Sequence, residues 1–395
     1  MSTQEASSAS PLDDQLHAAL CEREAQTLHR SLRILPSHIL DLASNDYLGL
    51  SRHPRVIEAA QLAIARWGSG ARASRLVSGH TPLHQELEDE IAAFKGCEAA
   101  LTFSSGYAAN LSVITALARS GDLLLCDKRN HASLIDACRL AGANGATVRY
   151  YSSWEKLRSL LHTSSTRRAR RLIVSDAVYS MDGDIVDLPQ LLECAHEFDA
   201  TIILDDAHGL GTVGASGRGV VEHFGITDTS RVVHVGTLSK ALGSQGGFAA
   251  GSRTLVEWLV NVARPFIYST GIAPAACGAA LAALRMLRAE PQRVHRLHEI
   301  GQALACGLIG VGLRVQHHGT PILSAVVGDA EQAVRWSASL QQRGVWCPAI
   351  RPPTVPVGTS RLRITASAQL IDADVERALK VFAQAQNEYS SKGIT

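Results

Sequence analysis

The 395-residue chain contains few aromatic residues, only 5%, and has almost no net charge, with 38 Lys and Arg against 37 Asp and Glu. Proteins that bind nucleic acid or an anionic membrane surface through their overall field need a strong positive excess, so a net charge of +1 argues against both partners. Apolar residue types nevertheless reach 46%, which excludes a disordered chain. The length suffices for two or three domains, each with its own core.

Long apolar runs and cysteine motifs are also absent. The most apolar stretch, residues 272–284, is too short to cross a bilayer and contains a proline and a glycine. Residues 1–14 lack the basic region and apolar core of a secretory signal. The eight cysteines are scattered, with a spacing that fits neither a zinc site nor a Cys-x-x-Cys pair. We therefore expect a cytoplasmic protein with reduced cysteines and no metal site.

Short β-rich runs alternate with helical patterns through most of the chain, which predicts crossover units and a mostly parallel sheet covered on both faces. Pro291 then begins a smaller α+β unit. We expect a tail and helix at 1–45, a large α/β domain at 46–288 and a small C-terminal domain at 289–395. The expected strands of the large domain are 101–103, 123–125, 147–150, 172–174, 201–204 and 232–235. Its expected helices are 54–67, 82–95, 106–119, 131–141 and 153–162, and the small domain should contain helices 292–309, 330–342 and 371–386 with strands 322–327 and 361–365.

A glycine motif at residues 209–214, GLGTVG, matches the G-x-G-x-x-G pattern of dinucleotide-binding proteins. The residues DDAH separate it from the preceding strand, and Gly217 and Gly219 break any helix that should carry a pyrophosphate. Asp228 has the spacing of a ribose-binding acid but precedes the next strand instead of ending it. The motif therefore gives little support for a nicotinamide enzyme.

A lone lysine stands in a tight loop of small residues, GTLSKALG at 236–243, directly after a predicted strand. Most lysines are solvated, and that is the simplest interpretation of Lys240. Small neighbours, however, leave space above its amine, and a lysine in a cavity loses its proton easily. A neutral amine at a strand end is what Schiff-base chemistry requires.

Asp205 and His208 follow another predicted strand, at the edge where ligands of open α/β sheets bind. Asp205 could instead cap a turn, and His208 could be an ordinary loop histidine. If pyridoxal phosphate is bound, an aspartate that faces the pyridine nitrogen keeps the ring protonated, so the ring can accept electrons from the substrate Cα. His208 could then reach the phenolic oxygen of that ring.

Two further strand-to-helix junctions carry polar residues. In FSSGYAAN, at 103–110, Ser104 or Ser105 can cap a helix whose free N–H groups suit a phosphate. In NHAS, at 130–133, His131 could stack on a planar ring, whereas Asn130 could simply cap the helix. Serine caps without a ligand are common, so neither junction identifies the site by itself.

Together and in this order, these motifs resemble those of the α-oxoamine synthases, which are pyridoxal-phosphate enzymes of aminotransferase fold-type I. The resemblance covers nearly the whole chain, from residue 16 to the C-terminus. It implies an α/β fold with a mostly parallel seven-stranded sheet in the large domain and a smaller C-terminal α+β domain. The matching stretches are 44–50, 78–79, 103–110, 130–133, 178–184, 205–209 and 236–251.

The resemblance implies that Lys240 attaches pyridoxal 5′-phosphate covalently and that Asp205 pairs with the pyridinium nitrogen. It places His131 over the ring face, so Lys240, His131 and Asp205 are the expected catalytic residues. Ser180 and His208 are expected near the phenolic oxygen. The residues expected around the cofactor, mainly at its phosphate, are Gly106, Tyr107 and Thr237.

Within the family, residues 349–356 and 267–270 resemble the members that condense L-alanine with pimeloyl-CoA, or with pimeloyl carrier protein, and release CO2. The resemblance assigns Arg351 to the amino-acid carboxylate and lines the substrate site with Arg23, His131 and Thr354. A bidentate arginine–carboxylate pair fixes which Cα bond stands perpendicular to the ring. From the residues alone, Arg351 could equally be a surface arginine before a proline-rich turn.

Other functions stay open at this point. Glycine C-acetyltransferase and 5-aminolevulinate synthase share most of the chemistry, whereas a dehydrogenase fits the glycine geometry poorly. A non-catalytic binding protein on this fold would be expected to lack the lysine or the aspartate. The resemblance also implies a homodimer with active sites at the subunit interface, in which Ser269 or Thr270 reaches the neighbour's phosphate.

Overall fold

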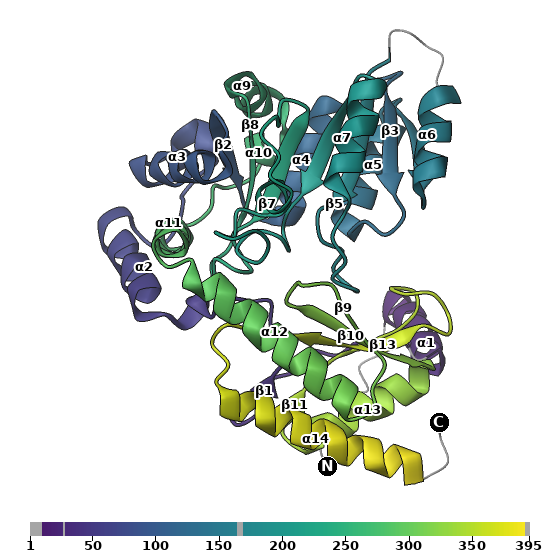
Figure 1. Ribbon diagram of the computed structural model, residues 1–395. Helices are drawn as coiled ribbons and strands as arrows, with labels where there is room; N and C mark the ends of the chain where they lie inside the picture. The colour runs from purple at the N-terminus through teal and green to yellow at the C-terminus, as the bar shows by residue number, and fades with distance from the viewer. Residues whose placement is uncertain (1–9, 27, 164–168, 392–395) are drawn as a thin grey trace, which may run out of the picture.

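The computed structural model describes residues 10–26, 28–163 and 169–391, so most of the tail expected at the N-terminus lies outside the described residues. Two lobes are visible in Figure 1, each built on a sheet. The strands of the upper lobe are β2 (Ala99–Phe103), β3 (Leu123–Asp127), β4 (Thr147–Tyr151), β5 (Arg171–Asp176), β6 (Ala200–Asp205), β7 (Val232–Thr237) and β8 (Gly247–Gly251).

These seven strands form one sheet in the order β2-β8-β7-β6-β5-β3-β4. Every neighbouring pair is parallel except the pairs made by β8, which runs antiparallel to both β2 and β7. The predicted mostly parallel sheet is therefore confirmed, and each strand expected from an apolar run forms. The sequence pattern does not predict β8, because its residues GFAAG are small and poor in β-branched types.

Helices cover both faces of this sheet because alternate residues of each strand point to opposite sides. Leu124 and Cys126 of β3 lie in one apolar cluster, and Leu123 and Leu125 lie in the other. The helices of the first cluster are α4 (Gly106–Leu117), α5 (Ala132–Ala143), α9 (Arg253–Val262) and α10 (Arg264–Ile267). Those of the second are α6 (Trp154–Thr163), α7 (Leu188–Glu197) and α8 (Val220–His223).

A third group of helices packs beside β2 and β8 and leads into the lower lobe (Figure 1). It consists of α2 (Pro54–Trp67), α3 (Pro82–Lys95) and α11 (Pro274–Ala289), with a 3-10 turn at Leu50–Arg52 and a π-helical turn at Arg75–Gly79. The α2 and α11 helices approach closely at Gly278, where a Cβ would lie 2.7 Å from the carbonyl oxygen of Ala59. The glycine therefore sets the distance between these two helices.

The lower lobe contains a four-stranded antiparallel sheet in the order β12-β13-β10-β9. All five elements that the sequence predicts here form, and the additional strands are two or three residues long, too short to give a periodic signal. Its elements are α12 (Gln292–Gly310), β9 (Val315–His317), β10 (Ile322–Gly328), α13 (Ala330–Gln342), β12 (Ala349–Ile350), β13 (Ser360–Thr365) and α14 (Asp372–Ser391).

Residues from the beginning of the chain join this lobe. Strand β1 (Leu40–Asp41) pairs in parallel with β11 (Val345–Trp346), and α1 (Pro11–Ala25) also lies at the lower lobe in Figure 1. The helical spacing of Leu16, Leu20 and Leu28 predicts one helix through all three residues, but α1 ends at Ala25. None of its residues is buried. No helix in the described part of the chain is long and apolar enough to span a membrane.

Scattered cysteines in a chain without disulfides are expected to be small buried apolar residues, and this expectation is wrong for two of them. Cys21 on α1 and Cys306 on α12 are exposed, because both lie on faces of helices that no other described element covers. Five others are buried and Cys97 is partly buried, and all eight are free thiols.

Candidate active site

The candidate catalytic residues lie at the carboxyl ends of neighbouring parallel strands. Asp176 ends β5, Asp205 ends β6, and Lys240 follows three residues after the end of β7. Asp176 and Asp205 are register partners on adjacent strands. Parallel strands bring their carboxyl ends to one edge of a sheet, which is why residues far apart in sequence meet here.

Lys240 belongs to a chain of hydrogen bonds. Its amine lies 2.8 Å from Nε2 of His208, and Nδ1 of that ring lies 2.6 Å from the hydroxyl of Tyr47. The Tyr47 hydroxyl donates to Oδ1 of Asn45 at 3.1 Å, and Arg363 donates to the same oxygen at 3.2 Å. Since Tyr47 donates its proton to Asn45, the network assigns the His208 proton to Nδ1 and leaves Nε2 to accept from Lys240.

Burial dominates the electrostatics of this group. It lowers the pKa of Lys240 to about 8, an effect that the charges of Asp205 and Asp176 oppose and that of Arg363 reinforces. Burial also lowers the pKa of His208 well below its usual range, and the cationic Lys240 lowers it further. Lys240 is therefore available as a neutral amine closer to neutral pH than an ordinary lysine.

Asp205 is buried and held by two donors. The backbone N–H of Ala207 donates to its Oδ1 at 2.9 Å, and Nδ2 of Asn110 donates to its Oδ2 at 2.6 Å. The same Asn110 nitrogen donates to Oγ of Ser133 at 2.9 Å, and that hydroxyl lies 2.8 Å from Nδ1 of His131. Asp205 and His131, which the sequence predicts to act on one ring, are thus linked through two intervening side chains.

The junction between β2 and α4 has the properties expected of a phosphate site. Ser105 caps α4 by accepting the N–H of Ala108 at 3.1 Å. The N–H groups of Gly106 and Tyr107 stand in the first turn, where helices leave amides without intrahelical acceptors. A Cβ at Gly106 would lie only 3.3 Å from Cβ of Thr237, so these two predicted residues are neighbours.

Hydroxyl groups complete this junction. Thr237 Oγ1 lies 2.6 Å from Oγ of Ser239 and donates to the carbonyl of Gly246 at 2.9 Å. The side chain of Tyr107 is half-exposed, and its hydroxyl donates to Asp136 on α5 at 2.7 Å. The ring of Tyr107 therefore lies at the edge of the junction.

Sequence reasoning missed Arg363. This residue on β13 is only 6% exposed, and its Nε donates at 2.6 Å to the carbonyl of Ser180, a residue predicted near the cofactor. It thus connects the lower lobe to the upper one beside Lys240. Its signal in the sequence is the alternation SRLRIT at 360–365, in which Arg361 and Arg363 occupy one face of a buried strand.

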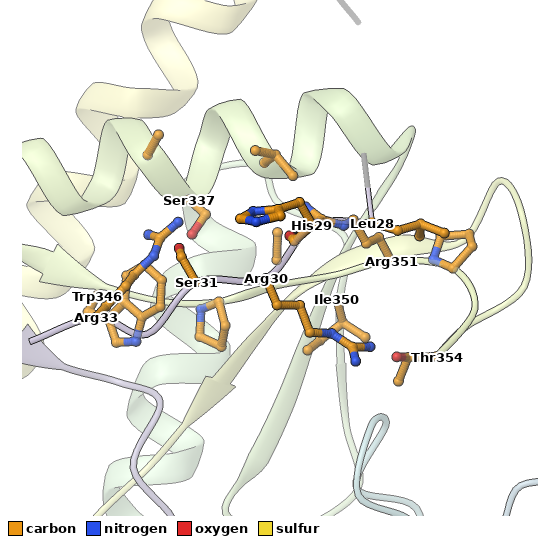
Figure 2. Close-up of a pocket in the computed structure, with 15 residues that line it drawn as sticks. Leu28, His29, Arg30, Ser31, Arg33, Ser337, Trp346, Ile350, Arg351 and Thr354 are labelled. Carbon is orange, nitrogen blue, oxygen red and sulfur yellow. The ribbon is translucent and has the colours of Figure 1, made fainter. Parts of the chain in front are cut away.

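The predicted substrate residues Arg351 and Thr354 belong to the lower lobe and are shown in Figure 2. They line a pocket of ≈ 470 Å³ between residues 28–33 and the lower lobe. Nη2 of Arg351 donates to the carbonyl of His29 at 3.2 Å. Arg23 is exposed in the last turn of α1. Among the described residues, no hydrogen bond joins Arg23 or Arg351 to the Lys240 group.

The glycine motif at 209–214 has a structural explanation. Asp206 forms a buried ion pair with Lys95, whose Nζ lies 2.7 Å from its Oδ2. A Cβ at Gly209 would lie 2.0 Å from Oδ1 of Asp206, and one at Gly219 would lie 1.8 Å from its Oδ2. Only the four-residue helix α8 follows. These glycines let the backbone enclose Asp206, and no long helix is present to carry a pyrophosphate.

The Asn130 side chain does not cap α5. His131 is the N-cap, with its Nδ1 accepting from the N–H of Ser133 at 3.2 Å. Asn130 instead donates to the carbonyl of Val174 at 2.8 Å and accepts from the N–H of Asp176 at 2.9 Å. The capping interpretation is therefore wrong, because the asparagine side chain turns toward β5.

These groups fit pyridoxal phosphate. The Lys240 amine of lowered pKa matches its aldehyde. The buried carboxylate of Asp205 matches its pyridine nitrogen, and the N-terminus of α4 with its adjacent hydroxyls matches its phosphate. Comparison with known proteins bears on the same point. The family described as aminotransferase class I and II matches residues 37–382. The chain belongs to this family.

Individual relatives are similar over almost their whole length. An 8-amino-7-oxononanoate synthase of Cellvibrio japonicus is 43% identical, with 98% of this chain and 99% of that protein covered. One of Mycolicibacterium gilvum is 45% identical, with 91% and 93% covered. The structure of a serine palmitoyltransferase variant from S. paucimobilis with a bound PLP–myriocin aldimine is 28% identical, with a TM-score of 0.88 and 97% and 100% covered. The predicted family resemblance, fold-type and cofactor are confirmed.

Proposed function

We propose that this chain is an 8-amino-7-oxononanoate synthase, a pyridoxal-phosphate-dependent acyltransferase of biotin biosynthesis. It would condense L-alanine with pimeloyl-CoA, or with pimeloyl carrier protein, and release the thiol and CO2. The observation that carries the proposal is the full-length similarity to synthases of that name. The grouping of Lys240, His208 and Asp205 at the strand ends supports it.

Pyridoxal phosphate, when bound, supplies an electron sink for negative charge at the amino-acid Cα. Lys240 would hold the cofactor through its amine, and the same amine, when free, would take the Cα proton of the amino acid. His208 keeps the amine oriented by accepting its hydrogen bond. Asp205 would keep a proton on the pyridine nitrogen, and His131 would pack on the ring.

Arg363 is better placed than Arg351 to bind the amino-acid carboxylate. The Arg363 cation is close enough to Lys240 and His208 to lower the pKa of both. Its guanidinium bonds Asn45 at 3.2 Å, whereas that of Arg351 bonds His29. The geometry therefore favours Arg363, while the resemblance assigns the carboxylate to Arg351, and variants can separate the two.

The pocket of Figure 2 suits the acyl donor. Arg30, Arg33 and Arg351 surround it, and Trp346 and Ile350 are among its apolar walls. The Arg33 guanidinium lies over the Trp346 ring, 5.0 Å from its centroid. Cations beside an apolar surface match a long acyl chain attached to phosphate groups, as both candidate donors carry.

A homodimer in the cytoplasm belongs to the same proposal. Three leucines of α1, Leu12, Leu16 and Leu20, are exposed along one helix. Leu76, Val77 and Tyr268 form exposed apolar positions near the bridge between residues 74 and 270. Apolar surface of this kind is typical of an interface with a second copy of the chain.

A screen of substrates tests the proposed activity. The holoenzyme should release free thiol from pimeloyl-CoA or pimeloyl carrier protein with L-alanine, and the amino-ketone product should contain the methyl carbon of labelled alanine. Glycine with acetyl-CoA or succinyl-CoA should give little turnover. Preferred use of either glycine pair would overturn the proposal in favour of another α-oxoamine synthase.

A further inference from the structure

Two buried carboxyl groups lie side by side at the cofactor edge of the sheet. Asp176 and Asp205 end adjacent parallel strands as register partners, and they are 3% and 5% exposed. The proposed chemistry gives a role only to Asp205. Burying a second acid next to it costs free energy unless hydrogen bonds or opposite charges compensate.

The contacts of Asp176 are with the loop that carries His131. Its Oδ2 accepts the backbone N–H of His131 at 2.6 Å, a short bond to the residue that caps α5. Its own N–H donates to Oδ1 of Asn130 at 2.9 Å, and Asn130 also bonds the Val174 carbonyl. The loop before α5 is therefore fastened to the end of β5 at two successive residues.

A second route ties the same imidazole to Asp205. Nδ1 of His131 bonds Ser133, and Asn110 bridges Ser133 to Oδ2 of Asp205 at 2.9 and 2.6 Å. The His131 ring is thus held through its side chain from Asp205 and through its backbone from Asp176. Because the two acids are strand neighbours, the contacts form a closed circuit around His131.

We propose that Asp176 is a positioning residue, which holds the His131 imidazole against the cofactor ring by accepting the His131 amide. This inference rests on the proposed function, since that function places His131 on the ring. Burial and the neighbouring charge of Asp205 raise the pKa of Asp176 well above its usual range. The hydrogen bond from the His131 amide and the charge of Lys240 oppose this rise.

Three substitutions isolate the contact. Asp176→Asn keeps an acceptor oxygen, so kcat should stay within about threefold of wild type. Asp176→Ala removes the acceptor, and displacement of the His131 ring should lower kcat by about 10- to 100-fold. Asp127→Ala is the matched control, because Asp127 also ends a strand and is buried but accepts from Tyr179 and Arg129 instead.

A double-mutant cycle shows whether Asp176 acts through His131. In a His131→Ala background, Asp176→Ala should lower kcat by less than about threefold further, since the ring it positions is gone. Affinity of apoenzyme for pyridoxal phosphate, measured by absorbance titration, supplies a readout that needs no turnover. It should weaken by about three- to tenfold in Asp176→Ala, the range expected for one lost stacking contact, and stay unchanged in Asp176→Asn.

The outcomes separate the two proposals. If the effects of Asp176→Ala and His131→Ala multiply, or if Asp176→Asn loses as much activity as Asp176→Ala, the positioning role is wrong. It is also wrong if Asp127→Ala lowers kcat and cofactor affinity as much as Asp176→Ala does. Failure of wild-type apoenzyme to bind pyridoxal phosphate at Lys240 would instead contradict the proposed function.

Discussion

The Lys240 amine lies 2.8 Å from Nε2 of His208, while the opposite nitrogen of the same ring lies 2.6 Å from the Tyr47 hydroxyl. Burial lowers the pKa of this imidazole and also that of the lysine, and the charges of Asp205 and Asp176 oppose only the lowering at the lysine. This arrangement leaves the amine both oriented and easily deprotonated, and it leads to the first prediction.

The rate at which apoenzyme captures pyridoxal phosphate should rise with pH and level off above about 8, because the neutral Lys240 amine is the nucleophile and its pKa is about 8. Stopped-flow absorbance between pH 6 and 10 measures this rate. Since Arg363 lowers the Lys240 pKa, Arg363→Met should move the profile to higher pH. Nα-acetyl-lysine, whose side-chain amine has a pKa near 10.4, provides the control. A flat profile would contradict the prediction.

Tyr47→Phe should reduce the free energy of unfolding of the apoenzyme by about 1–3 kcal/mol, because it leaves the buried His208 N–H without an acceptor. Urea denaturation measures the change. Tyr107→Phe also removes a hydroxyl with a hydrogen bond, but at an exposed position, so it should change stability by less than about 0.5 kcal/mol. Equal losses of unfolding free energy in both variants would show that the buried Tyr47 hydroxyl stabilises the protein no more than the exposed one of Tyr107.

Lys95→Met should destabilise the protein by about 3–5 kcal/mol, since it leaves Asp206 buried without its cation. Adding Asp206→Asn should recover part of that loss, because the asparagine is uncharged and of the same size. Thermal or urea unfolding of the two single variants and the double variant gives the coupling. If the two substitutions lower the free energy of unfolding additively, the unpaired Asp206 is not the reason that Lys95→Met destabilises the protein.

Arg363→Met should raise the KM for L-alanine roughly 30-fold or more, corresponding to about 2 kcal/mol, with a smaller effect on the acyl donor. Arg351→Met should instead raise the KM for the acyl donor, because Arg351 lines the pocket with Arg30 and Arg33. Steady-state kinetics with each substrate varied in turn distinguishes the roles. The reverse pattern would restore the assignment that the resemblance makes.

The sequence predicted the sheet well because its strands are buried on both faces and give continuous apolar runs, as in residues 123–125 and 172–174. The sequence predicts Lys240, Asp205 and His131 at one edge of the sheet for a related reason, since each follows such a run. The carboxyl end of a parallel strand can be located from the chain alone.

Contacts between distant segments could not be found in this way. Arg363 stands in a strand of the lower lobe, and Tyr47 lies in a segment with little regular structure. Their meeting at Oδ1 of Asn45 depends on how the lobes pack, which no local pattern encodes. The sequence did not predict the ion pair of Lys95 and Asp206 either. The glycines that make room for it gave only a match to a nucleotide-binding motif.

The pairing of β1 with β11 has a consequence for how the protein is made. Asp41 aligns with Trp346, which leaves the ribosome about 300 residues later. At roughly 5–20 residues per second, the first strand waits some 15–60 s for its partner. Asn45 and Tyr47 lie just beyond that strand, so a nascent chain long enough to contain Lys240 still lacks the anchor of their segment. The ribosome must pass Trp346 before the lysine acquires its full set of neighbours.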